Sequence, residues 1–191
     1  MNQLKEAPEI LLREGDSQLI IYTRCFQDLK LDDFFTQIEW RQNKIRVFGK
    51  EYDEPRLTAW FGPAYKYSGI QWRALEMPEF LMKIAHRLRV LCGMDFNSVL
   101  MNYYRAGSDS MGWHSDNEHE MDTRCIASVS LGASRLFALR KGRSGKSLRT
   151  HLHHGDLLVM NNLQEGWQHC IPKVKGNVGP RLNMTFRYIR S

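Results

Sequence analysis

The sequence has few cysteines, and none of them forms a C-x-x-C pair; they are Cys25, Cys92, Cys125 and Cys170. This spacing excludes a zinc ribbon and a thioredoxin-type motif. No apolar run is long enough to span a bilayer, and residues 1–6 lack the apolar region of a signal peptide. We therefore expect reduced thiols, no membrane partner, and a protein of the cytoplasm, or of the nucleus in a eukaryote.

An internal repeat and a low-complexity tract are also missing from the 191 residues. A hydrophobic fraction of 42% and a charged fraction of 25% are typical of a soluble globular protein. This length predicts a single domain over residues 1–191. The net charge of +6 favours a polyanionic partner such as nucleic acid, although many basic proteins bind none.

Two stretches have the periodicity of a helix. The apolar stripe of the first consists of Leu31, Phe34, Phe35 and Ile38. The second is predicted to start at Pro78 and to stop at Gly93, because proline favours the first helical position and glycine favours the C-terminal end.

Short strands are predicted for most of the remaining chain. Two fall within residues 9–23, one at 44–48 and one at 56–61. The later ones are 98–104, 111–115, 125–131, 135–141, 148–152, 156–161, 167–171 and 181–189. Because helices come first and strands later, the pattern favours a mainly β sandwich or barrel over a doubly wound parallel sheet.

The last predicted strand has two unlike faces. Its apolar face, which should pack on a core, carries Leu182, Met184, Phe186 and Tyr188. Its polar face carries Arg181, Asn183, Thr185 and Arg187. That polar face is either solvated or lines a cavity, and in a cavity its guanidinium groups would require an anionic ligand.

The stretch from Trp113 to His119 is the richest in chemically active side chains. On a strand, His114 and Asp116 point the same way, so that both could bind one metal ion. A third ligand would complete the two-histidine, one-carboxylate set of non-haem Fe(II) oxygenases. The candidates for it are His151, His153, His154 and His169. The alternative is an acidic, solvated loop.

Two other groups of polar residues stand out. Asn102 and Tyr104 share one face of an apolar strand, where they could hydrogen-bond a ligand or simply be satisfied polar side chains at a sheet rim. Gly145-Lys146-Ser147 resembles the end of a P-loop, but the required first glycine is Arg140. The segment is instead a basic turn, either solvated or in contact with a phosphate backbone.

Four groups of residues, taken in order, resemble the AlkB family of Fe(II)- and 2-oxoglutarate-dependent dioxygenases, most closely its duplex-acting members. They are Asn102-Tyr103-Tyr104, His114-Ser115-Asp116, His169, and the run from Arg181 to Arg187. That run matches the family signature R-x-N-x-T-x-R at every fixed position. The resemblance starts near residue 45, which leaves residues 1–44 as a family-variable N-terminal extension. It implies a double-stranded β-helix, a jelly-roll-like core with flanking helices.

The resemblance also implies roles for individual residues. Three would hold Fe(II) and leave one side open for 2-oxoglutarate and O2: His114, Asp116 and His169. Five would bind the cosubstrate 2-oxoglutarate: Asn102, Tyr104, Arg181, Asn183 and Arg187.

The reaction that the resemblance implies is oxidative demethylation of alkylated bases in DNA, such as 1-methyladenine and 3-methylcytosine. 2-Oxoglutarate is decarboxylated while the N-methyl group is hydroxylated and released as formaldehyde. The base must leave the stack to react. Residues from about 45 to 70 resemble the family's nucleotide-recognition lid. Base contacts are expected from Tyr65, Tyr67, Ser68, Glu118 and a wedge at Phe48, with the base between Tyr67 and the His114 ring.

Two other interpretations compete with this one. The same chemistry could act on RNA or on a protein side chain, but the wedge segment and the basic turn favour DNA, double- or single-stranded. A β-domain that binds nucleic acid without catalysis would require no metal, and the complete ligand set argues against it. We expect the protein to be a monomer.

Overall fold

A computed structural model describes residues 7–47, 49–67, 70–142 and 145–190. Its larger sheet has seven antiparallel strands in the order β1–β2–β13–β10–β15–β8–β5. Their bounds are β1 (Glu9–Glu14), β2 (Ser17–Tyr22), β13 (Leu157–Asn161), β10 (Met121–Gly132), β15 (Arg181–Ile189), β8 (Ser98–Tyr104) and β5 (Leu57–Phe61). Strand β15 therefore lies near the middle of this sheet, between β10 and β8.

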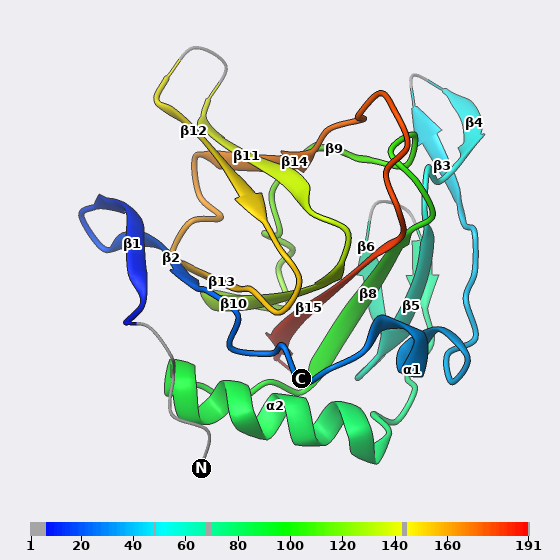
Figure 1. The fold of residues 1–191 in the computed structure, drawn as a ribbon, viewed down its shortest axis with the longest axis horizontal. Coiled ribbons are helices and arrows are strands. Elements are labelled where there is room, and N and C mark those ends of the chain that lie inside the picture. Colours follow the sequence, from blue (N-terminus) through cyan, green and yellow to red (C-terminus); the bar gives the residue numbers. More distant parts are fainter. Residues whose placement is uncertain (1–6, 48, 68–69, 143–144, 191) are drawn as a thin grey trace.

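The smaller sheet has four antiparallel strands in the order β12–β11–β14–β9. They are β12 (Ser147–Leu152), β11 (Arg135–Lys141), β14 (Trp167–Ile171) and β9 (Met111–His114). The two sheets face each other (Figure 1). Apolar side chains from both sheets form one core between them. This arrangement confirms the mainly β, jelly-roll-like core with flanking helices.

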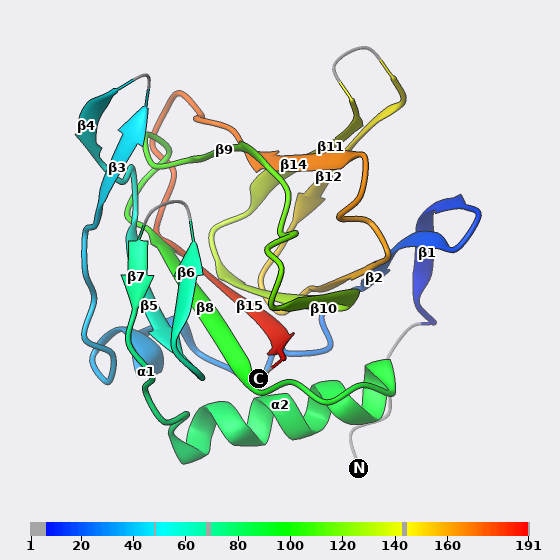
Figure 2. The same ribbon diagram turned by 180° about the vertical axis from the view of Figure 1, so that it is seen from behind.

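Two separate hairpins complete the strands of the described residues. The first joins β3 (Lys44–Val47) to β4 (Lys50–Asp53), and the second joins β6 (Tyr65–Tyr67) to β7 (Ile70–Trp72). Both lie on the β5 side of the molecule (Figure 2). The sequence pattern predicted β3 but not β4, β6 or β7, which are short and lack clear alternation.

Helices α1 (Leu31–Phe35) and α2 (Glu79–Cys92) lie on the outer side of the larger sheet (Figure 1). The second predicted helix is confirmed as α2, and its apolar residues Leu81, Ile84 and Leu88 are buried in the core on that side of the sheet. Gly93 ends α2 in a left-handed conformation with φ of 69°, which glycine adopts without strain. Pro78 precedes the first helical residue instead of occupying that position.

The first helix is shorter than its apolar stripe predicts. It ends at Phe35, and Ile38 is buried from the turn that follows. Phe35 itself is 42% exposed and lies against Tyr103, with ring centroids 4.7 Å apart. Five residues make barely more than one turn, so tertiary packing and not the helix decides where these side chains go.

The two faces of β15 are used as the alternation predicts, with one exception. Leu182, Met184 and Phe186 pack in the core between the larger sheet and the helices. Tyr188 was predicted to join them but is 38% exposed. Pairing between β15 and β10 is irregular just before Tyr188, where the register shifts.

The N-terminal strands belong to the larger sheet, because residues 18–22 of β2 pair with all five residues of β13. Among the described residues, neither helix is long and apolar enough to cross a membrane.

Candidate active site

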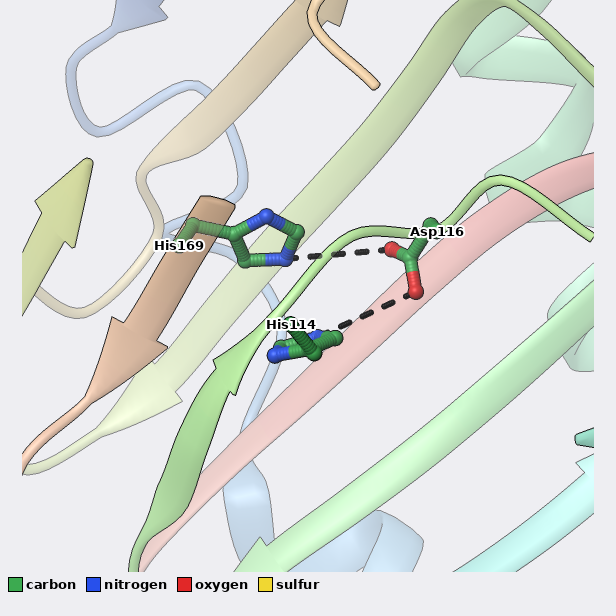
Figure 3. Close-up of side chains that lie close together, drawn as sticks. All are labelled: His114, Asp116 and His169. Atoms are coloured by element: carbon green, nitrogen blue, oxygen red, sulfur yellow. Dashed lines mark ion pairs between the residues drawn. The ribbon is translucent and has the colours of Figure 1, made fainter. Parts of the chain in front are cut away.

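His114 and His169 lie on neighbouring strands of the smaller sheet and are paired directly across β9 and β14. Asp116 follows just after the end of β9. One ligand atom from each of the three residues lies within 4.8 Å of the others. In Figure 3 both imidazole rings lie beside the carboxylate of Asp116. The Nε2 atoms of His114 and His169 are each 3.8 Å from one of its oxygens.

Hydrogen bonds fix the ring of His114. The carbonyl oxygen of Gly112 can only accept, so Nδ1 of His114, 2.9 Å away, must carry the ring proton. The lone pair is therefore on Nε2, the nitrogen nearest Asp116. The hydroxyl of Ser115 donates to the carbonyl of Trp167 at 2.6 Å, which holds β9 against β14.

The charge states suit a divalent metal. Burial lowers the pKa of His169 to about 3 and also lowers the pKa of His114, so both rings are neutral at pH 7. Burial raises the pKa of Asp116, but the positive charge of Arg187 and its hydrogen bond to the carboxylate act against this, and the net pKa is lowered. Two neutral imidazoles and one carboxylate are the donor set of non-haem Fe(II) sites.

Asp116 is held from two sides. Arg187 donates from Nη2 to its Oδ1 at 2.8 Å, and its backbone N–H donates to the side-chain oxygen of Gln164 at 2.9 Å. Its other carboxylate oxygen, Oδ2, has no hydrogen-bond partner within the described part of the chain. A buried carboxylate oxygen that lies beside Nε2 of His169 and has no hydrogen-bond donor fits a metal ion.

Arg181 has the properties of an anion-binding group. It is 1% exposed, and its Nη2 donates to the hydroxyl of Ser130 at 2.9 Å. Nε and Nη1 have no hydrogen-bond partner among the described residues. Burial lowers the pKa of Arg181 to about 10, so it is still a cation at pH 7. A buried guanidinium with unused donors fits a carboxylate of 2-oxoglutarate.

The two predicted cosubstrate amides differ in their surroundings. Asn183 donates from Nδ2 to Ser128 and to the carbonyl of Val129, and its oxygen accepts from Thr185. Asn102 instead accepts from Arg56 through its oxygen. Tyr104 is buried, with the guanidinium of Arg181 5.3 Å from its ring centre. All of the predicted metal and cosubstrate residues line one cavity between the sheets.

The other candidate histidines lie elsewhere. His151 and His153 are exposed, and Nδ1 of His154 accepts from the backbone N–H of Gly132 at 3.1 Å. The metal cluster of the described residues therefore takes His169 as its third member. Spacing along the chain could not distinguish these histidines, because the pairing of β14 with β9 arises only in the tertiary structure.

The predicted base contacts are only partly described. Glu118 is half-buried in the loop between β9 and β10. Tyr65 and Tyr67 belong to β6, but their side chains are not among those described. Ser68 and Phe48 lie outside the described residues. These four and Glu118 therefore stay predictions.

Sequence reasoning missed a buried polar group beside the site, formed by Glu54, Arg56 and Thr58. Its signal was present as polar residues at alternate positions, 54, 56 and 58, entering a strand that is otherwise apolar.

Comparison with known proteins agrees with this geometry. The family model of the 2OG-Fe(II) oxygenase superfamily matches residues 23–187, so fold and site together define a member of that class. Human DNA oxidative demethylase ALKBH2 is 36% identical over 188 residues, which cover 88% of this chain and 72% of the relative. Human alpha-ketoglutarate-dependent dioxygenase alkB homolog 3 is 35% identical over 199 residues. That match covers 92% of this chain and 67% of the relative. The chain belongs to the AlkB family.

Relatives of this kind are longer than the chain. The bovine alkB homolog 3 is 36% identical, and the match covers 86% of this chain but 64% of the relative. The solved structure of OsALKBH1 superposes with a TM-score of 0.66 at 17% identity, covering 93% of this chain and 99% of that one. That likeness is one of fold.

Proposed function

We propose that this protein demethylates alkylated bases in DNA, of the 1-methyladenine and 3-methylcytosine type, in a reaction that consumes 2-oxoglutarate and O2. The observation that carries the proposal is the convergence of His114, Asp116 and His169 with the buried cation of Arg181 in one cavity. The relatives named DNA oxidative demethylase supply the substrate class.

Bound Fe(II) and 2-oxoglutarate would supply the oxidising power: 2-oxoglutarate would be converted to succinate and CO2, with one oxygen atom of O2 entering succinate and the other the methyl C–H bond. The hydroxymethyl group would then leave as formaldehyde: the C–N bonding electrons return to the base nitrogen, and the hydroxyl proton is released to solvent. His114, Asp116 and His169 hold the metal. Arg181 pairs with a carboxylate of the cosubstrate, and Arg187 keeps Asp116 ionised and oriented. The protein excludes bulk water, because these groups are buried between two sheets.

Contacts to nucleic acid are proposed on the side of the two hairpins and at the basic turn between β11 and β12. Arg140 lies over the Trp113 ring at 4.1 Å and is held by Gln168. Lys141 and Lys146 both pair with Glu14. Arg149 is exposed. This charge distribution suits a phosphate backbone. We propose further that the protein acts as a monomer, in the cytoplasm or the nucleus.

The test is release of formaldehyde and succinate from a DNA oligonucleotide that carries 1-methyladenine. Product should appear only with Fe(II) and 2-oxoglutarate together. Activity that survives in His114→Ala and Asp116→Ala would refute the assignment, because each change removes one of three metal ligands.

The alternative substrates are RNA and protein side chains. Competition between single-stranded RNA and duplex DNA with the same lesion decides between the nucleic acids. The wedge proposal for Phe48 has its own test. If Phe48→Ala leaves the ratio of duplex to single-strand repair unchanged, the wedge proposal is wrong.

A further inference from the structure

The amide of Asn102 has a defined orientation. Nε of Arg56 lies 2.7 Å from Oδ1 of Asn102. A guanidinium can only donate, so the atom of Asn102 that meets it must be the oxygen. The NH2 group, which can only donate, is the remaining polar end of a side chain that lines the cosubstrate cavity.

Arg56 is itself fixed. It is 4% exposed, and its Nη2 donates to Oε1 of Glu54 at 2.6 Å. Its Nη1 reaches the carbonyl of Ser110 at 3.4 Å, just before the strand that carries His114. The guanidinium therefore cannot turn away from Asn102 without breaking a buried ion pair.

Glu54 is also fully engaged. Its second oxygen, Oε2, accepts from the hydroxyl of Thr58 at 3.0 Å and from the side-chain amide of Asn43 at 3.2 Å. Glu54 lies two residues before Arg56 in the chain and is only 2% exposed. A buried carboxylate with several donors holds the guanidinium in one position.

Asn183 provides a contrast. It lies opposite Asn102 on the neighbouring strand. Its NH2 group already donates to Ser128 at 2.7 Å and to the Val129 carbonyl at 3.2 Å. Within the described part of the chain, no hydrogen bond uses the NH2 group of Asn102, whereas the NH2 group of Asn183 is already engaged.

We propose that Arg56 is a positioning residue for 2-oxoglutarate. It holds the oxygen of Asn102 so that the NH2 group donates to an oxygen of the cosubstrate. Without Arg56 the amide could rotate and present its oxygen to that anion, which would be repulsive. The proposal rests on the proposed function, since it concerns the same cosubstrate. It predicts that Arg56 acts on 2-oxoglutarate only through Asn102.

The test measures 2-oxoglutarate binding by calorimetry, with Mn(II) in place of Fe(II) and without O2. The double variant Glu54→Gln/Arg56→Met removes both buried charges, so no unpaired charge is left to unfold the protein. We expect about tenfold weaker 2-oxoglutarate binding, the loss of one hydrogen bond to a charged group, and unchanged Mn(II) affinity. Arg41→Met, which removes an exposed arginine paired with Glu39, is the matched control and should bind normally.

A mutant cycle separates positioning from a purely structural role. If Arg56 acts through Asn102, then adding Glu54→Gln/Arg56→Met to Asn102→Ala should weaken 2-oxoglutarate binding no further. Additive losses would overturn the proposal, as would unchanged binding in the double variant. Asn102→Asp keeps an acceptor for Arg56 but replaces the donor with a charged oxygen, so it should bind at least as weakly as Asn102→Ala.

The same titrations distinguish a failure of the proposed function from a failure of the proposed role of Arg56. Failure of the unaltered protein to bind 2-oxoglutarate would refute the proposed function. If the unaltered protein binds 2-oxoglutarate normally but the losses in the cycle are additive, only the proposed role of Arg56 is refuted, and the proposed function stands.

Discussion

Replacing Arg181 by lysine tests how the cavity recognises its anion. The change keeps the positive charge and removes the planar set of N–H donors. In the structure the guanidinium is 1% exposed, and it uses Nη2 on Ser130 while Nε and Nη1 have no partner within the described residues. Those donors are the ones available to a carboxylate.

The expected magnitude follows from this geometry. A lysine ammonium is compact and lacks the forked set of donors of an arginine. It therefore cannot bond to both Ser130 and the carboxylate. Losing one charge-assisted hydrogen bond costs about 1.5–3 kcal/mol, so 2-oxoglutarate affinity should fall about 10- to 100-fold. Charge loss is not the cause, because the pKa of Arg181, lowered by burial to about 10, leaves it cationic at pH 7.

The assay is calorimetric titration of 2-oxoglutarate in the presence of Mn(II), with Mn(II) affinity measured separately. Metal affinity should be unchanged, since Arg181 donates to none of the three metal ligands in the structure. Arg124→Lys is the control, because Arg124 is an exposed partner of Asp122. Unchanged 2-oxoglutarate binding, or a parallel loss of metal, would refute this reading of β15.

Three further predictions concern stability, each measured by urea unfolding. Hydrogen bonds from Arg124 lower the pKa of Asp122 to about 2 from an ordinary 3.8. A lowered carboxylate pKa stabilises the fold above 3.8, and this is lost as the pH falls towards 2. Asp122→Asn should therefore cost about 2 kcal/mol at pH 7 and little at pH 2; a difference that persists at pH 2 would contradict this. Gly132→Ala should cost about 3 kcal/mol or more, because φ is 87° and a Cβ would meet the Pro180 carbonyl; near-normal stability would disprove the clash. Leu88→Ala should cost about 2–5 kcal/mol, since Leu88 is fully buried, whereas Val90→Ala, at 74% exposure, should change little; equal effects would contradict the assigned face of α2.

Local patterns in the sequence determined much of this structure. Strict alternation placed the side chains of β15 on two faces, and only Tyr188 departs from the prediction. Apolar spacing located α2, and glycine chemistry its end at Gly93. These features depend on geometry within a few residues, so the order of residues specifies them.

Local sequence pattern identified two of the three metal ligands and left the third open. His114 and Asp116 were paired by their spacing, whereas the third histidine was one of four until the family resemblance favoured His169. Its place beside His114 depends on β14 pairing with β9, two strands more than 50 residues apart along the chain. Strand pairing over such distances is set by packing of the whole core, and no local rule encodes it.

Other features were decided only by the tertiary structure. The polar face of β15 could have been solvated; it is buried because the smaller sheet covers it. The orientation of the Asn102 amide depends on Arg56, which lies just before β5, the edge strand of the larger sheet. The sequence by itself determined which residue types carry the chemistry and on which face of their strands they lie. The tertiary structure decided which of them meet, because burial and hydrogen bonding between distant strands fix both charge and orientation.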